Sequence, residues 1–335
     1  MNPIKQARLG HSNLLVTRLG LGGAAFAGLY ADVSEDTASD AIRRARALGI
    51  NLFDTAPEYG HGKSEARIGR ALAGHARESY VLCTKVGKLL APADVSKVRS
   101  PEFVNPLPFR LVNDYSYAGV MRSVEESLKR LNTERLDVLY IHDPDEHYAE
   151  AINGAYLALR KLRLEGVVSA IGVGMNQADM LVRFAREGEF DCFLLAGRYT
   201  LIDHAGLMEL LPLCLEKGIS IVIGGPYNSG ILATGAISGA KFNYIDAPPE
   251  ILERVRRIEV VCARYSIPLR AVALQFAFGH PAVVAVIPGA RSADEVEENY
   301  RLLEFAIPSE LWADLKQQEL LPQNVPVPGV GQFGA

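Results

Sequence analysis

The sequence alternates short β-branched or leucine-rich runs with amphipathic helical segments along nearly its whole length. Eight such runs are found, at residues 17–22, 50–54, 80–85, 136–142, 168–174, 190–195, 219–225 and 283–289. The segments between them place apolar residues three and four apart, as Val120, Val124 and Leu128 are in residues 117–131. Nearly continuous apolar strands are typical of a parallel sheet covered by helices. Eight such units predict an α/β fold of the (β/α)8 barrel type rather than a doubly wound sheet.

No composition break or long linker divides the chain, so we expect one barrel domain over residues 1–335. The segment ARLGHSNLLV, residues 7–16, predicts an N-terminal β-hairpin, and a helix that carries Trp312 is expected near the C-terminus before a tail without periodicity. The proline-rich residues 89–115 also lack periodicity and are interpreted as a loop over one mouth of the barrel.

Composition argues against several classes of function. The formal net charge is only −4, which argues against nucleic acid or an anionic membrane surface as a partner. The four cysteines, Cys83, Cys192, Cys214 and Cys262, lack the spacing of a zinc site and are interpreted as reduced core thiols, so no metal is expected. The chain shows neither a signal peptide nor a run of roughly 18 apolar residues. These features predict a cytoplasmic protein with a small-molecule substrate, and they leave the oligomeric state open.

Polar side chains stand where three successive predicted strands end. Asp54 closes the second run, with Tyr59 just after it, while Lys85 closes the third run and His142 the fourth. In a barrel, these ends form the face that carries active sites. A tyrosine hydroxyl, with a pKa of about 10, needs nearby positive charge to exchange protons at neutral pH, and a lysine held by an aspartate could supply it. The group predicts proton transfer beside a carbonyl or alcohol carbon, although an Asp–Lys pair or a buried histidine is by itself often structural.

The segment FDTAPEYGHGKSEARIGRAL, residues 53–72, resembles the signature of the aldo-keto reductases. Further resemblance follows in the family's order in TK at 84–85, LDVLYIHDPD at 136–145, GVGMN at 172–176, GGPYNSGIL at 224–232 and IPGARSADEVEEN at 287–299. The resemblance implies a barrel that moves hydride to or from a nicotinamide dinucleotide. It also implies that Tyr59 is the proton donor or acceptor, that Lys85 and Asp54 tune it, and that His142 orients the reacting oxygen.

The same resemblance implies a cofactor site on the later loops. Asn176 matches the asparagine that binds the nicotinamide carboxamide, and residues 224–232 resemble a pyrophosphate-binding segment in which glycines let backbone amides approach an anion. Positions in residues 287–299 match those that hold the adenosine end. The expected cofactor-binding residues are Gly22, Gly23, Asn176, Tyr199, Gly225, Pro226, Tyr227, Ser229, Gly230, Leu232, Gly289, Arg291, Ser292, Glu295, Glu298 and Asn299.

Departures from the family pattern bear on the cofactor. Gly289 and Glu295 stand where relatives that prefer NADP usually carry basic residues. A glutamate would repel a 2′-phosphate but tolerate a ribose hydroxyl, so we expect NAD in preference to NADP, with Arg291 as a partial compensation. Gly224 replaces the aromatic residue that stacks on the nicotinamide in many relatives. Tyr199 could substitute for it or could simply cap a strand end.

Three runs look similar to the bacterial D-threo-aldose 1-dehydrogenase group within the family: residues 114–123, 196–201 and 224–235. This likeness implies oxidation of the anomeric carbon of a free aldose, of the L-fucose, D-arabinose or L-galactose type, to the lactone. Two alternatives stay open. The group includes pyridoxal 4-dehydrogenase, which oxidises an internal hemiacetal, and some barrels of the superfamily are cofactor-bound regulatory subunits with little turnover.

Side chains on the expected mouth loops could suit either substrate. The expected substrate contacts are Phe26, Tyr59, Tyr115, His142 and Asp143. Asp143, Asp145 and Arg110 would offer the hydrogen bonds that a sugar needs. Phe26 and Phe109, by contrast, would offer an aromatic wall for pyridoxal. Composition does not choose between them, since loops are commonly polar without binding anything.

Overall fold

The computed structural model of the chain describes residues 4–94, 98, 100 and 102–329. Its centre is a parallel eight-stranded sheet in the order β14-β11-β10-β9-β8-β5-β4-β3. Parallel bridges between Leu19 and Val286 and between Gly22 and Gly289 join the last strand to the first and close the cylinder. The strands are β3 (Leu21–Gly22), β4 (Leu52–Asp54), β5 (Val81–Val86), β8 (Val138–His142), β9 (Ala170–Met175), β10 (Cys192–Ala196), β11 (Ser220–Gly224) and β14 (Val283–Ile287). Each lies within or overlaps one of the eight predicted runs, and the (β/α)8 barrel is confirmed.

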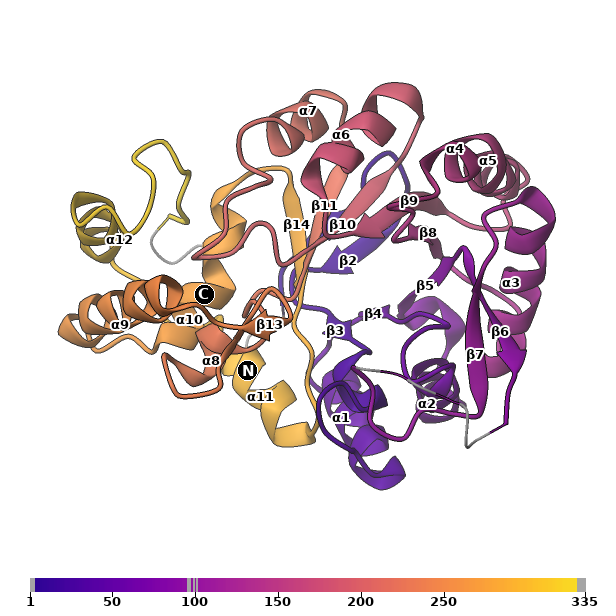
Figure 1. Cartoon of the computed structure of the whole chain (residues 1–335), viewed down its shortest axis with the longest axis horizontal. Coiled ribbons are helices and arrows are strands. Elements are labelled where there is room, and N and C mark those ends of the chain that lie inside the picture. The colour runs from indigo at the N-terminus through magenta and orange to yellow at the C-terminus, as the bar shows by residue number, and fades with distance from the viewer. Residues whose placement is uncertain (1–3, 95–97, 99, 101, 330–335) are drawn as a thin grey trace.

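Helices form an outer ring around these strands (Figure 1). They are α1 (Glu35–Ala47), α2 (Lys63–Leu72), α3 (Tyr117–Leu131), α4 (Tyr148–Glu150), α5 (Tyr156–Leu164), α6 (Ala178–Glu187), α7 (Leu210–Glu216), α8 (Ile231–Thr234), α9 (Pro249–Arg264), α10 (Leu269–Phe276), α11 (Ala293–Leu302) and α12 (Ser309–Gln317). On α3, Val120 and Val124 are buried while Lys129 is exposed, as the periodicity predicts. Ser116 caps this helix by accepting a hydrogen bond from the backbone N–H of Gly119 at 3.0 Å.

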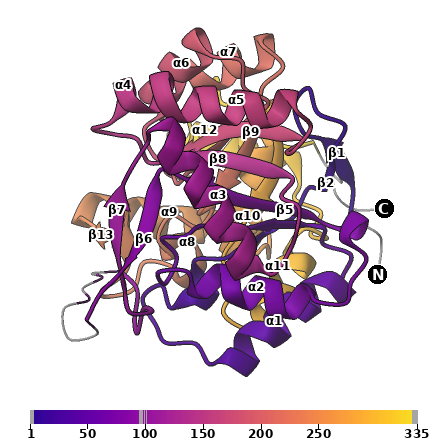
Figure 2. The same cartoon turned by 90° about the vertical axis from the view of Figure 1, so that its right-hand side faces the viewer.

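Opposite ends of the barrel carry different hairpins (Figure 2). The predicted N-terminal hairpin is present as β1 (Gln6–Arg8) and β2 (Leu15–Thr17), and its apolar residues pack with the side chains that fill the barrel. The other end carries β6 (Lys88–Pro92) paired with β7 (Phe109–Asn113), and β12 (Lys241–Phe242) paired with β13 (Ile245–Asp246). The interpretation of residues 89–115 as an irregular loop is therefore wrong in part, because short mixed sequences can pair as strands without clear alternation.

The C-terminal helix packs against the barrel's outer ring. Trp312 on α12 is 2% exposed, and its ring lies 6.3 Å from that of Phe276, so it belongs to the core, as expected. The tail that was expected to be irregular continues past residue 329, and that last part lies outside the described residues. All four cysteines are buried and free. Within the described part of the chain, no helix combines the length and the apolar character that crossing a membrane requires.

Candidate active site

Polar side chains occupy the last inward-facing positions of neighbouring strands at one end of the barrel. The inward positions just before them are apolar and pack in the barrel interior: Leu52, Cys83 and Tyr140. Because side chains alternate between the two faces of a strand, the residue two positions further on also points inward. These residues are Asp54 on β4, Lys85 on β5 and His142 on β8. The strand pattern alone thus brings a carboxylate, an ammonium group and an imidazole to one rim.

Tyr59 joins these three from the turn that follows β4. The Lys85 ammonium donates hydrogen bonds to Asp54 Oδ2 at 2.6 Å and to the Thr55 carbonyl at 2.8 Å. The same Nζ lies 4.6 Å from the centroid of the Tyr59 ring. The Tyr59 ring meets that of His142 edge-on, with 5.8 Å between centroids. The four residues expected to be catalytic are therefore gathered at one place.

The acidity of Tyr59 differs from the expectation. Burial raises the pKa of Tyr59 well above 10, and the carboxylates of Asp54, Asp143 and Glu58 raise it further. The Lys85 ammonium, whose positive charge would favour the phenolate, is paired with Asp54. Burial thus favours the protonated phenol, whereas the sequence suggested a phenol made more acidic by Lys85.

His142 is neutral. Burial lowers the pKa of His142 well below 6.5, and the ammonium groups of Lys88 and Lys85 lower it further. Its Nδ1 is a buried polar atom without a hydrogen-bond partner, as is Oδ1 of Asp54. Buried unpaired polar atoms are rare in native proteins, so both are suited to meet a ligand.

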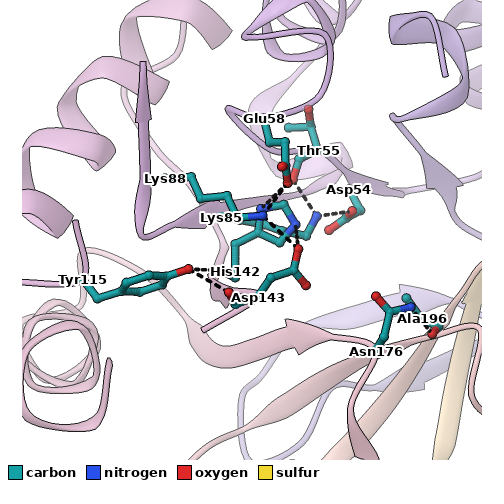
Figure 3. A network of polar contacts seen from close by, with 10 residues as sticks. All are labelled: Asp54, Thr55, Glu58, Lys85, Lys88, Tyr115, His142, Asp143, Asn176 and Ala196. Carbon is teal, nitrogen blue, oxygen red and sulfur yellow. Dashed lines mark hydrogen bonds and ion pairs between the residues drawn. The ribbon is translucent and has the colours of Figure 1, made fainter. Parts of the chain in front are cut away.

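A second charged group surrounds the imidazole, and the sequence pointed to only one of its members. Lys88 Nζ contacts Glu58 Oε2 at 2.7 Å and Asp143 Oδ2 at 3.0 Å, and Figure 3 shows the ring of His142 beside them. Asp143 was expected, but Lys88 and Glu58 were missed. Their positions in the sequence could have indicated them, because Glu58 directly precedes Tyr59 and Lys88 comes just after β5.

Two expected substrate contacts lie behind the rim instead of in it. Tyr115 and Phe26 are each 0% exposed. The Tyr115 hydroxyl donates to the backbone carbonyls of His142 at 2.6 Å and Asp143 at 2.9 Å, which fixes the end of β8 (Figure 3). The proposed contacts of Tyr115 and Phe26 with substrate therefore do not fit this structure, because a motif near a strand end does not reveal which of its side chains is covered.

The expected nicotinamide and pyrophosphate contacts lie on the loops after β9 and β11. The Asn176 side chain donates to the Ala196 carbonyl at 2.7 Å (Figure 3). Gly225 and Gly230 have positive φ, and an added Cβ would meet nothing within 4 Å of Gly230 and only the Gly197 backbone near Gly225. Bare, open backbone of this kind can approach a phosphate closely. Together with the unpaired atoms of the rim, these loops fit a nicotinamide dinucleotide.

Other expected cofactor residues are engaged with one another. The Tyr227 hydroxyl donates to Asn299 Oδ1 at 2.6 Å, which ties the loop after β11 to α11. Arg291 forms a pair with Glu295, with Nη2 to Oε1 at 2.7 Å, and its backbone N–H also donates to that carboxylate. Ser292 caps α11 by accepting from the Glu295 N–H. The Arg291 charge is therefore partly offset by Glu295, which limits the compensation expected from it.

The remaining expected cofactor residues differ in exposure. Pro226 and Leu232 are buried, Ser229 is half-buried, and Glu298 is turned toward Arg270 at 2.5 Å. Close packing leaves little room for a side chain at three glycines at the end of β3 and after β14: Gly22, Gly23 and Gly289. For example, a Cβ on Gly23 would lie 2.4 Å from Ser64 Oγ.

Tyr199 is not in a position to stack on a nicotinamide ring. It is 0% exposed, and its ring packs against Phe276 with 5.2 Å between centroids. The alternative, an ordinary buried aromatic after a strand end, agrees with the structure. The expectation of ring stacking is wrong because the chain turns at Gly197 and carries this side chain into the core.

Another aromatic residue, missed in the sequence, lies over the mouth. Tyr244 is at the tip of the β12–β13 hairpin, where it and Asn243 both have positive φ. A two-residue turn of this kind favours glycine at the second position, so a tyrosine there is strained. Burial raises the pKa of Tyr244, a hydrogen bond with the Asn176 side chain opposes the rise, and Asp143 adds to it. Tyr244 thus reaches the side chain expected to bind the carboxamide.

Known proteins resemble this chain along most of its length. The model of the Aldo/keto reductase family matches residues 18–319. A pyridoxal 4-dehydrogenase of Microbacterium luteolum is 39% identical over 93% of this chain and 97% of its own. A D-threo-aldose 1-dehydrogenase of a Pseudomonas species is 36% identical over 93% of this chain and 96% of its own. The holo form of an aldo-keto reductase from Bacillus halodurans superposes with a TM-score of 0.75 at 26% identity, over 96% of this chain and 98% of its own.

Proposed function

The chain belongs to the aldo/keto reductase family, and we propose that its single barrel domain is an NAD-dependent oxidoreductase that converts the anomeric carbon of a free aldose to the lactone. The observation that carries the proposal is the gathering of Tyr59, Lys85, Asp54 and His142 around one rim. Its family transfers hydride with nicotinamide dinucleotides, and the loop after β11, with its open glycines Gly225 and Gly230, suits such a cofactor.

The reaction needs a proton and a hydride to leave the same alcohol. A nicotinamide dinucleotide held by the loops after β9 and β11 would supply the acceptor for the hydride that leaves the anomeric carbon. In the oxidative direction, Tyr59 in its phenolate form would take the proton from the hydroxyl on that carbon, so that the carbon becomes the carbonyl of the lactone. His142, neutral and with Nδ1 unpaired, would hold the reacting oxygen by a hydrogen bond. The Lys85–Asp54 pair fixes the position of the Tyr59 ring.

The charges at the rim favour a neutral substrate with several hydroxyl groups. The side chains of Glu58, Asp143 and Lys88 are between 14% and 31% exposed, so they can meet a ligand, and together they carry one net negative charge. Carboxylates and ammonium groups are strong hydrogen-bond partners for sugar hydroxyls. A phosphorylated or carboxylated sugar would be repelled by the same charge.

A substrate panel tests this proposal. L-Fucose, D-arabinose or L-galactose should support continuous NADH formation, well beyond one equivalent of enzyme. The kcat/KM for a sugar phosphate should be lower by at least about tenfold, which corresponds to about 1.4 kcal/mol of repulsion. Binding of NAD without sustained turnover of any compound would contradict the enzymatic proposal and favour a regulatory subunit.

Pyridoxal is the second candidate substrate, and an aromatic pair beside the rim favours it. The Tyr59 ring lies 6.0 Å from that of Phe103 in a tilted pair, which offers an aromatic wall beside the rim. The pyridoxal 4-dehydrogenase relative is also 39% identical. In the same panel, turnover of pyridoxal with no turnover of the three sugars would replace the aldose proposal.

Cofactor preference depends on the pair formed by Arg291 and Glu295. While Glu295 pairs with the guanidinium, the positive charge of Arg291 is partly offset where the resemblance places the adenosine end of the cofactor. Glu295→Gln should release Arg291 and raise kcat/KM for NADP by about tenfold or more, since a charge-assisted hydrogen bond contributes about 1.5 to 3 kcal/mol. Glu310→Gln on α12 is the control for the change in charge. An unchanged ratio of NADP to NAD activity in Glu295→Gln would refute the role assigned to this pair.

A further inference from the structure

We propose that Lys88 is a positioning residue for the reaction, whose ammonium joins the loop that carries Tyr59 to the strand end that carries His142. This inference rests on the proposed function of the same site. Lys88 contacts Glu58, the residue before Tyr59, at 2.7 Å, and Asp143, the residue after His142, at 3.0 Å. One side chain thus connects the immediate neighbours of the two groups that would handle the reacting oxygen and its proton.

The two carboxylates held by Lys88 lie beside the two nitrogens of the imidazole ring. Glu58 Oε2 is 3.5 Å from Nδ1 of His142, and Asp143 Oδ2 is 3.4 Å from Nε2. Lys88 thus fixes the position of both charged groups next to the ring (Figure 3). A side chain whose neighbours fix its orientation loses less conformational freedom when it binds a substrate.

The backbone around Lys88 is built for this contact. Gly87 has a φ of 102° and directs the chain from β5 into β6, and a Cβ at this position would lie 2.2 Å from the Tyr115 ring. Tyr115 in turn donates to the carbonyls of His142 and Asp143. Asp143 itself has a φ of 41°, a strained conformation for a residue other than glycine. Tyr115 therefore packs against the bend that places Lys88 at the rim, and it also holds the backbone of Asp143.

Lys88 also sets the charge around His142. The ligand atoms of Glu58, His142 and Asp143 all lie within 4.8 Å of one another, close enough to attract a cation, and the Lys88 ammonium is the cation found there. Burial acts to lower the pKa of Lys88, but Asp143 and Glu58 outweigh it, so the ammonium keeps its charge. Without Lys88, two carboxylates would face the imidazole, and the Lys85 ammonium and the Tyr59 phenol would remain near it.

The variant Lys88→Met should therefore change the protonation of His142. Lys88 is one of the groups that lower the pKa of His142, and its removal leaves the two carboxylates to raise it. In the variant, burial still lowers the pKa of His142, but this pKa should lie closer to its ordinary value than in the wild type. As the pH drops, activity should therefore begin to fall at a higher pH in the variant than in the wild type, since the charged imidazole pairs with the carboxylates.

The experiment compares Lys88→Met with Lys88→Arg and Lys161→Met as holoenzymes. Lys88→Met should lose about 10- to 100-fold in kcat, the effect expected of a misplaced reacting group, while the NADH dissociation constant stays unchanged. Lys88→Arg keeps the charge and should recover most of the rate. Lys161 on α5 has a side chain that is 57% exposed, and Lys161→Met removes the same charge far from the rim, so it should match the wild type.

A proton NMR titration of the His142 ring gives a readout that is independent of turnover. If Lys88→Met matches the wild type in kcat and in the His142 titration while the wild type oxidises aldoses, the inference is wrong and the proposed function stands. If the wild type oxidises none of the tested compounds, the proposed function fails, and the titration still decides whether Lys88 controls His142. Should Lys88→Met not fold, Lys88→Gln, which removes the charge but keeps a donor, gives the same comparison.

Discussion

Replacing Tyr59 with phenylalanine is expected to lower kcat by about 10²- to 10⁴-fold, the usual contribution of a general acid or base. The NAD dissociation constant should change little, because the hydroxyl would take part in proton transfer and not in holding the cofactor in the ground state. Steady-state kinetics together with quenching of protein fluorescence by NADH measure the two quantities separately.

The pH profile adds a second readout to the Tyr59→Phe experiment. Burial and then the nearby carboxylates raise the pKa of Tyr59, so its phenolate is scarce at neutral pH. The rate of oxidation should therefore rise with pH, by up to about tenfold per unit, while the rate of reduction should not. Tyr59→Phe should lose this slope.

The control for this variant removes a hydroxyl elsewhere. Tyr265 donates to Asp314 Oδ2 at 2.8 Å, among the outer helices, and Tyr265→Phe should keep the wild-type kcat. An equal loss of kcat and of NAD affinity in Tyr59→Phe would show that the phenol is a cofactor contact instead of the proton-transfer group.

Replacing Lys85 with methionine is expected to destabilise the fold by about 3 to 5 kcal/mol at neutral pH, as well as removing activity. The reason is that Asp54, 3% exposed, would be left with a buried charge and no counterion. Urea unfolding at several pH values measures the loss.

The sign of the pH dependence follows from the Asp54 carboxyl. Burial raises its pKa, and Lys85 opposes the rise, so the pKa rises further in Lys85→Met. Between the unfolded and the folded pKa, the native state binds more protons than the unfolded state, and stability therefore falls as the pH rises. The destabilisation of Lys85→Met should thus be smaller at about pH 5 than at about pH 8.

The double variant Lys85→Met/Asp54→Asn removes both charges and is the matched control. It should recover much of the lost stability and lose the dependence on pH, because no buried charge remains. The opposite result, a loss of stability in Lys85→Met that is the same at every pH, would mean that Asp54 is not left charged in the folded state.

Much of the site could be predicted because it depends on patterns that are local in the sequence. The alternation of side chains along a strand sends Asp54, Lys85 and His142 inward, and the parallel order of the strands brings their carboxyl ends to one rim. The short segment from Asp54 to Tyr59 limits how far the phenol can lie from the pair. The hairpin at the N-terminus and the helix at Trp312 were likewise visible as local patterns.

Side-chain exposure and loop contacts were not predictable in this way. Tyr115 and Tyr199 stand beside strand ends as a ligand contact would, yet both are fully buried. Tyr244 belongs to a hairpin with no sequence signal except a short Asn-Tyr turn. Nothing local shows that Lys88, rather than another lysine, meets Glu58.

The sequence by itself determined the barrel, the order of its strands and the rim at which the catalytic candidates meet, because hydrophobic periodicity and parallel pairing fix the direction of each strand residue. Only the tertiary structure decided the surroundings that shift the pKa values of Tyr59 and His142, the ion pairs of Lys88 and the pairing of Arg291 with Glu295. These depend on burial and on distances between charges carried by different loops. Both quantities arise when separate segments pack together, and electrostatic energy changes steeply with each of them.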